Sequence, residues 1–201
     1  MNAAPGGEVV IATTNAGKLR EIRAILGDDA PVLRGLDDFA RIDFPEEGDD
    51  YAANATAKAR VAAAATGRVA LADDSGLEVA GLGGAPGPRS ARFGGLGLDD
   101  RQRAAALLQA MAGLSEAGRD ARFVCAAALA TPTGDVVTAR GECSGRIFAE
   151  PRGSGGFGYD PVFEVASGTA MAELPPERKN QISHRARALR ALHAALTALE
   201  C

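Results

Sequence analysis

Two adjacent carboxylates, Asp73 and Asp74, are the side chains of this 201-residue chain best suited to metal-dependent chemistry. They follow the short apolar run 69–71 and precede Ser75 and a segment rich in glycine and proline. We therefore expect a buried strand that ends at the carboxylates, where α/β proteins place reactive groups. Burying a carboxylate there costs roughly several kcal/mol unless a cation compensates for it. A divalent metal ion would do so, and the division of roles between Asp73 and Asp74 stays open.

A candidate phosphate site lies near the start of the chain. Residues 8–13 are predicted to form a strand, and a helix is predicted to begin just after them. The polar residues of this turn are Thr13, Thr14, Asn15 and Lys18. Unpaired N–H groups and a partial positive charge at a helix N-terminus favour phosphate, and Lys18 adds a full charge. The alternative is an ordinary helix cap beside an exposed lysine.

A second source of carboxylates is the acidic segment 37–50, in which Glu46 is the candidate metal ligand. Because Mg²⁺ binds through one or two carboxylates together with substrate phosphates, Glu46 and Asp74 are its predicted protein ligands. The helix predicted over 51–66 follows. Asn54 and Lys58 share one of its faces, which is interpreted equally well as a solvent face.

A glycine-rich segment, 153–160, is the candidate site for a nucleobase. Its residues Phe157, Gly158, Tyr159 and Asp160 offer aromatic rings, a close backbone approach and a carboxylate. The alternative is a mobile loop with a core-facing phenylalanine. A long helix is predicted from Glu177 to the C-terminus, and its first turns carry Lys179, His184 and Arg185. Cations near a helix N-terminus are unfavourable alone, so an anionic ligand is indicated.

The composition limits the function classes. Net charge is −4, which argues against binding of a nucleic-acid polymer. Three cysteines without a CxxC pair indicate reduced thiols. No apolar run is long enough to span a membrane and no signal peptide is apparent, so we expect a cytoplasmic protein. No linker interrupts residues 1–201, which are predicted to form a single domain.

Five motifs in order resemble the inosine/xanthosine triphosphate pyrophosphatase family and together cover nearly the whole chain. They are ATTNAGK (12–18), PEEGDDYAANATAKA (45–59), ADDSGLEV (72–79) with GGAPGPRSARFGG (83–95), GGFGYDPVF (155–163) and ERKNQISHRARAL (177–189). The resemblance implies an α/β fold with two lobes, an elongated mixed β-sheet flanked by helices, and an active cleft between the lobes. It also implies a homodimer that acts on a small-molecule nucleoside triphosphate.

The implied activity is Mg²⁺-dependent hydrolysis of ITP, dITP and XTP to the monophosphate and pyrophosphate. By motif, Asp74 resembles the catalytic carboxylate, and Glu46 and Asp74 resemble the metal ligands. The residues that resemble substrate contacts are Thr13, Thr14, Asn15, Lys18, Ser75, Phe157, Gly158, Tyr159, Asp160, Lys179, His184 and Arg185. The chain departs from the family pattern at Ala53, where the family usually has glutamate.

Two other functions remain open on the sequence alone. A nucleotide sensor without turnover would need the same loops and cations, although the extra acids would repel a triphosphate in the absence of metal. A related pyrophosphatase could act on modified pyrimidine nucleotides.

Overall fold

The computed structural model describes residues 7–27, 30–166 and 168–197, and the chain divides into two compact units. Unit 1 comprises Met1–Asp74, Cys125–Gly141 and Arg185–Cys201, and unit 2 comprises Ser75–Val124 and Glu142–His184. Both units are built from segments distant in sequence. Among the helices of the described residues, none combines the length and the apolarity needed to cross a membrane.

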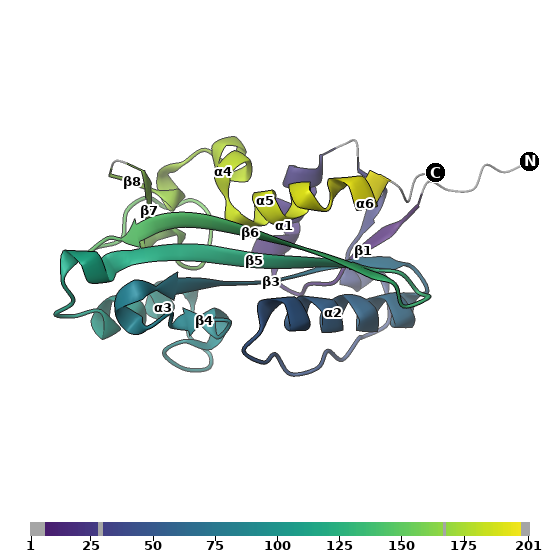
Figure 1. Ribbon diagram of the computed structural model, residues 1–201, viewed down its shortest axis with the longest axis horizontal. Helices are drawn as coiled ribbons and strands as arrows, with labels where there is room; N and C mark the ends of the chain where they lie inside the picture. The colour runs from purple at the N-terminus through teal and green to yellow at the C-terminus, as the bar shows by residue number, and fades with distance from the viewer. Residues whose placement is uncertain (1–6, 28–29, 167, 198–201) are drawn as a thin grey trace, which may run out of the picture. The chain divides into compact units, whose positions relative to one another are not determined.

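Helices and one mixed sheet make up the fold, which confirms the predicted α/β class (Figure 1). The strands are β1 (Val9–Ile11), β2 (Leu33–Arg34), β3 (Val69–Val79), β4 (Pro86–Gly87), β5 (Asp120–Ala130), β6 (Val136–Ile147), β7 (Phe163–Ala166) and β8 (Thr169–Ala170). The helices are α1 (Ala16–Leu26), α2 (Tyr51–Thr66), α3 (Asp100–Ala110), α4 (Pro176–Ile182), α5 (His184–Ala191) and α6 (His193–Thr197). The strand order is β2-β1-β3-β5-β6-β7-β8, and β4 pairs with β3. Pairing is parallel at β1 and antiparallel at β4, β7 and β8.

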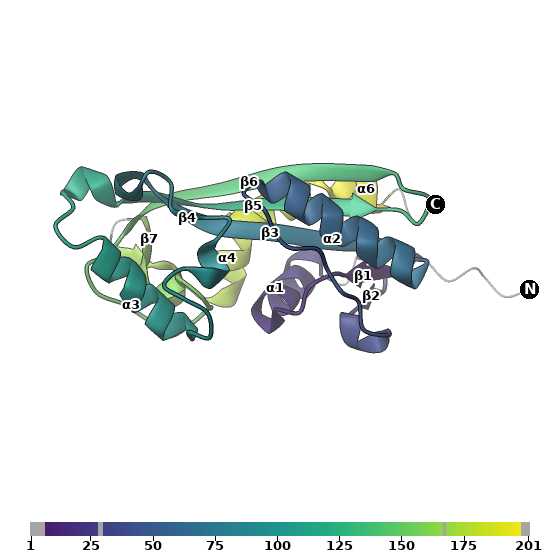
Figure 2. The same cartoon turned by 90° about the horizontal axis from the view of Figure 1, so that it is seen from below.

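In unit 1, helices cover both faces of the sheet. Helices α1, α5 and α6 lie on one face and α2 lies on the other (Figures 1 and 2). Ile11 and Leu71 pack with Ile22 of α1 and Leu189 of α5. The α2 residues that are fully buried are all alanines, Ala55, Ala59, Ala62 and Ala63. Small side chains allow α2 to approach the strands closely, so this helix holds its polar side chains near β3.

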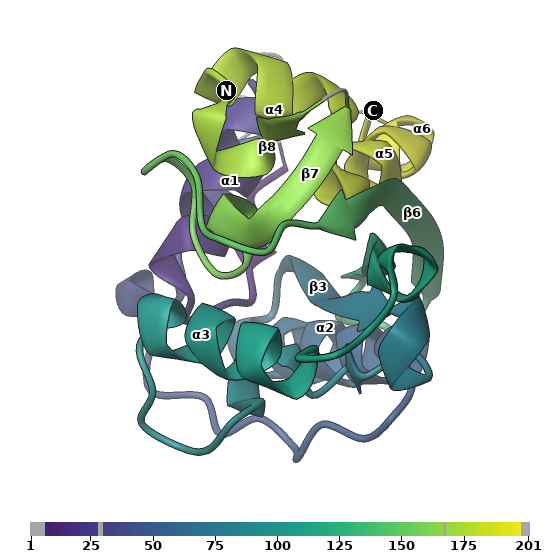
Figure 3. The same cartoon turned by 90° about the vertical axis from the view of Figure 1, so that its left-hand side faces the viewer.

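In unit 2, helices α3 and α4 lie on opposite sides of strand β3 (Figures 1 and 3). Leu107 of α3 and Met111, the C-cap of that helix, belong to one buried cluster with Phe123 of β5 and Phe163 of β7. The rings of Phe123 and Phe163 are tilted by 46° with centroids 4.4 Å apart. This apolar core fixes the glycine-rich segment that precedes β7.

The predicted strand end at Asp73 and Asp74 is wrong. Strand β3 continues through both carboxylates to Val79, and its later part pairs with β4, with Leu77 opposite Gly87. Aspartate and glycine are uncommon in strands, so Asp73, Asp74 and Gly76 favour a loop at this place in the sequence. The partners supplied by β4 and by distant cations outweigh that local preference.

The predicted single C-terminal helix is also wrong. Helix α4 ends at Ile182, and Ser183 adopts an extended conformation (φ −64°, ψ 156°) before α5 begins at His184. Ser183 is fully buried. The break changes the direction of the chain, so Lys179, His184 and Arg185 do not lie on one continuous helical face.

Candidate active site

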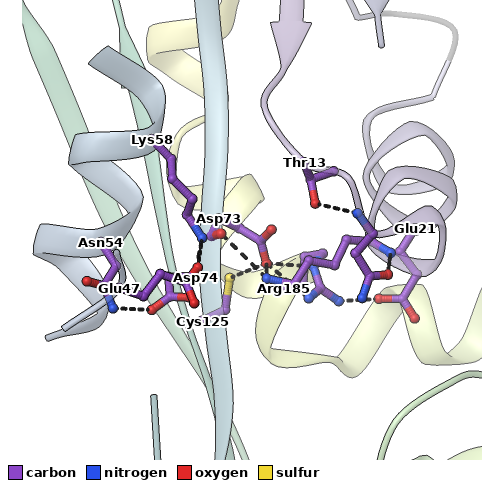
Figure 4. Close-up of polar contacts among 11 residues, drawn as sticks. Thr13, Glu21, Glu47, Asn54, Lys58, Asp73, Asp74, Cys125 and Arg185 are labelled. Atoms are coloured by element: carbon purple, nitrogen blue, oxygen red, sulfur yellow. Dashed lines mark hydrogen bonds and ion pairs between the residues drawn. The ribbon is translucent and has the colours of Figure 1, made fainter. Parts of the chain in front are cut away.

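Asp73 and Asp74 point to opposite faces of β3, because successive side chains of a strand alternate. Figure 4 shows Asp74 on the side of α2, and Asp73 on the side of α1 and α5. Both carboxylates are nearly inaccessible to solvent, with 1% and 3% of their surface exposed. The adjacent acids therefore have different partners and can have different roles.

Asp74 is held by two residues of α2. The amide of Asn54 donates to Oδ2 over 2.8 Å, and the ammonium of Lys58 lies 3.4 Å from Oδ1. Burial raises the pKa of Asp74 above its ordinary value, against the opposing effects of Lys58 and Asn54. A further positive charge beside this carboxylate would stabilise its ionised form.

Lys58 bridges Asp74 to the acidic segment before α2. Its Nζ lies 2.7 Å from Glu47 Oε1. Burial lowers the pKa of Lys58, but the negative charges of Asp74 and Glu47 outweigh burial and raise it. The structure thus places Glu47 at this bridge, while the predicted metal ligand Glu46 is exposed and adjacent to it in the chain.

Sequence reasoning assigned no role to Glu47, Asn54 or Lys58. The i, i+4 spacing of Asn54 and Lys58 was the available signal, since it places both on one helix face. Whether this face meets solvent or a binding site was ambiguous, because it shows no apolar pattern. Ala53, the position that departs from the family pattern, is exposed on α2.

Asp73 is the centre of a buried ion-pair network. Nε and Nη2 of Arg185 donate to its Oδ2 over 3.1 and 3.0 Å, and Lys18 Nζ lies 3.3 Å away. Nη1 of Arg185 also pairs with Glu21, and the Cys125 thiol contacts Oδ2 at 3.9 Å. Burial would raise the pKa of Asp73, but Lys18 and Arg185 hold it well below its usual range. Two protein cations pair with this carboxylate, whereas Lys58 is the cation beside Asp74.

The predicted strand, turn and helix start are observed as β1, a short loop and α1. Binding of phosphate at this turn stays a prediction. Asn15 is the N-cap, and its side chain accepts from Lys18 N–H over 3.0 Å. Thr13 Oγ1 accepts from Asn15 N–H over 3.2 Å, and Thr14 is exposed. The helix cap of the alternative interpretation is present, but the ammonium of Lys18 is mostly buried and lies beside Asp73.

In unit 2, the glycine-rich loop is organised by Asp160. Its Oδ2 accepts from Phe157 N–H over 2.8 Å and pairs with the Lys179 ammonium, which lies 4.9 Å from the Phe157 ring centroid. The side chain of Tyr159 is buried, and its hydroxyl donates to Ser90 O over 2.9 Å. Three of the predicted base contacts therefore also fix the loop itself.

The remaining predicted contacts are His184 and Ser75. His184 stacks on Phe123, with centroids 4.8 Å apart and an interplanar angle of 14°. Ser75 follows Asp74 on β3 and is partly buried. The structure thus separates His184, which stacks in unit 2, from Arg185, which pairs with Asp73 and Glu21 in unit 1. Contact of Arg185 with a substrate stays a prediction.

The carboxylate of Asp74 fits a magnesium ion that takes its other ligands from a substrate and from water. Within the described residues, no three histidine, cysteine or acidic side chains gather as a complete metal site. Mg²⁺ does not need such a set, because it commonly takes one or two carboxylates and completes its shell with phosphates and water. The carboxylate of Asp74 is a suitable protein ligand, because a bound cation would stabilise its ionised form and oppose the effect of burial.

Comparisons with known proteins agree with this geometry. Residues 9–195 match the model of the Ham1 family. A dITP/XTP pyrophosphatase of Geobacillus kaustophilus is 47% identical over 184 residues, covering 90% of each chain. A dITP/XTP pyrophosphatase of Geobacter sulfurreducens is 50% identical over 185 residues, covering 90% of this chain and 92% of the relative. A solved HAM1 protein from Coxiella burnetii is 40% identical with a TM-score of 0.85, covering 96% and 99%. Since the match includes both carboxylates, the turn before α1 and the glycine-rich loop, this chain belongs to the Ham1 family.

Proposed function

We propose that this protein hydrolyses the deaminated purine nucleoside triphosphates ITP, dITP and XTP to the nucleoside monophosphate and pyrophosphate. The observation that carries the proposal is the pair of carboxylates on β3. Asp73 pairs with Lys18 and Arg185, and Asp74 is buried with a raised pKa beside a lysine and an amide. Relatives that align over nine-tenths of the chain bear the name of this activity. The activity would keep deaminated purines out of DNA and RNA.

Asp74 is the proposed catalytic residue, which orients or deprotonates the attacking water. Bound Mg²⁺, held by Asp74, Glu46 and phosphate oxygens, would neutralise charge on the triphosphate and lower the pKa of that water. The N–H groups at the start of α1 and the ammonium of Lys18 bind phosphate oxygens and stabilise charge on the leaving pyrophosphate.

Base recognition is assigned to unit 2. The sequence indicated an anionic ligand near Lys179, whereas the ammonium of Lys179 pairs with Asp160 and lies over the Phe157 ring. We therefore place Lys179 with the base-binding loop. His184 is the proposed donor to the 6-keto oxygen of the purine. An adenine amino group would leave such a donor unpaired, and unpaired polar groups in a site can reject a substrate by orders of magnitude.

A substrate panel tests the proposal. Hydrolysis of ITP, dITP, XTP, ATP and GTP is measured as pyrophosphate release at equal concentrations. We expect kcat/KM for the three deaminated purines to exceed that for ATP by roughly 100-fold or more. Binding of ITP without turnover would instead support the sensor, and preference for a modified pyrimidine nucleotide would support the other pyrophosphatase class.

The metal assignment is tested at the neighbouring glutamates. Glu46→Gln is expected to raise the Mg²⁺ concentration needed for half-maximal rate by roughly tenfold, because it removes one anionic ligand. Glu47→Gln is the matched control, since Glu47 is paired with Lys58. Its expected effect on the metal requirement is less than threefold, on the order of one ion pair. The reverse order of effects would move the ligand assignment from Glu46 to Glu47.

We also propose that the protein is a cytoplasmic homodimer, as the family resemblance implies. Light scattering after size-exclusion chromatography would test the oligomeric state, and a single species of 20.5 kDa would contradict it.

A further inference from the structure

The base-binding loop of unit 2 is fixed by a residue outside every motif discussed above. Asp100 Oδ2 accepts from the N–H of Gly158 over 2.7 Å, across 58 positions of sequence. Gly158 has φ +63°, in the left-handed region that favours glycine. Its neighbours Phe157 and Tyr159 are tied to Asp160 and Ser90. Three consecutive loop residues are therefore each held by a different side chain or carbonyl.

Asp100 is not needed to cap the helix that carries it. The N-cap of α3 is Asp99, whose side chain accepts from Gln102 N–H over 2.8 Å. The Gln102 side chain accepts in return from Asp99 N–H over 3.0 Å, which completes a capping box. The carboxylate of Asp100, in the first turn, is directed to the loop instead.

The contact borders a cavity of about 530 Å³ between the first turns of α3 and the glycine-rich loop. Asp100, Arg101 and Ala104 line it from the helix, and Phe157, Gly158 and Pro161 line it from the loop. Losing the Asp100 contact would allow the loop to move into this space, because no packed side chains fill it.

We propose that Asp100 is a positioning residue that holds the loop 157–160 in the conformation that binds the purine. The inference rests on the proposed function, and it extends recognition of the base to helix α3. A charge-assisted hydrogen bond orders the backbone before the ligand arrives. Binding then does not have to supply the entropy cost of ordering the loop.

Three variants test this role. Asp100→Ala removes the acceptor, and Asp100→Asn keeps one carbonyl acceptor at the same place. Asp99→Ala is the matched control, because it weakens the cap of the same helix without touching the loop. We expect Asp100→Ala to raise KM for ITP by roughly fivefold, with kcat within twofold, which corresponds to one hydrogen bond. Asp100→Asn should restore KM to within twofold, and Asp99→Ala should lower thermal stability with KM unchanged.

A second readout is independent of activity. Amide hydrogen exchange of Gly158 is followed in each variant without nucleotide. We expect faster exchange in Asp100→Ala only. If KM is unchanged in Asp100→Ala while Gly158 exchanges faster, or if Asp99→Ala raises KM as much as Asp100→Ala, the positioning role is overturned. Failure of the unaltered protein to hydrolyse any deaminated purine nucleotide would contradict the proposed function, whereas unchanged Gly158 exchange in Asp100→Ala would contradict this inference alone.

Discussion

Asp74→Asn is expected to lower kcat for ITP by roughly 1000-fold, because the variant loses both a general base and an anionic metal ligand. The amide is nearly isosteric and can still accept from Asn54, so the fold should persist. The measurement is the initial rate of pyrophosphate release at saturating ITP and Mg²⁺, with circular dichroism to confirm folding.

Glu78→Gln is the matched control for this variant. Glu78 lies on the same strand and on the same face by alternation, and it pairs with Arg122 over 2.7 Å. Its neutralisation should change kcat by less than twofold. A folded Asp74→Asn protein with undiminished turnover would remove Asp74 from the catalytic role.

Arg185→Met is expected to destabilise the protein by about 3–5 kcal/mol, because it removes a buried cation and the two hydrogen bonds that it donates to the buried carboxylate of Asp73. The side chains of Arg185 and Asp73 are 1% and 0% exposed. Methionine retains most of the apolar stem, so loss of packing contributes little. Urea unfolding followed by circular dichroism measures the change in the free energy of unfolding.

Arg146→Met makes the same substitution at an exposed ion pair. Arg146 contacts Glu116 over 2.8 Å with 42% of its side chain exposed, and we expect a loss below about 1 kcal/mol. The double variant Asp73→Asn/Arg185→Met should recover part of the loss, since residue 73 then carries no buried negative charge, although Lys18 and Glu21 keep their charges. Equal effects of the two arginine substitutions would contradict the account of the network.

The network also predicts how stability depends on pH. Lys18 and Arg185 outweigh burial and depress the pKa of Asp73 in the folded state. A carboxyl with a depressed folded pKa stabilises the fold above the pKa of the unfolded carboxyl, about 4, and loses this contribution as the pH falls below that value. Unfolding free energies measured without metal should therefore decline more steeply below about pH 4 in the unaltered protein than in Asp73→Asn.

Local sequence signals were sufficient for several elements. Helix α2 was predicted with its observed bounds, because alanine-rich propensity is strong and a glycine follows it. The turn before α1 was predicted because a strand, a capping residue and an amphipathic helix follow in order. The extent of β3 was not predictable from its own residues, since the strand depends on pairing with β4 and on cations that neutralise its acids.

The residue types at the candidate site were easier to predict from the sequence than the interaction partners of those residues. The motif around Asp74 was recognisable in one dimension, whereas the assignment of Arg185 to Asp73 depends on the break at Ser183, which no glycine or proline marks. Asp100 lacked any sequence signal beyond its position in a helix start. Contacts between residues more than 50 positions apart, such as Arg185 with Asp73, are set by the packed fold and not by local pattern.

The most direct test of the account is product analysis of ITP hydrolysis during a Mg²⁺ titration. We predict IMP and pyrophosphate in equal amounts, at a rate that rises with Mg²⁺ and vanishes when the metal is chelated. Formation of IDP and phosphate, or a rate that persists without metal, would contradict a dication-assisted attack arranged by Asp74.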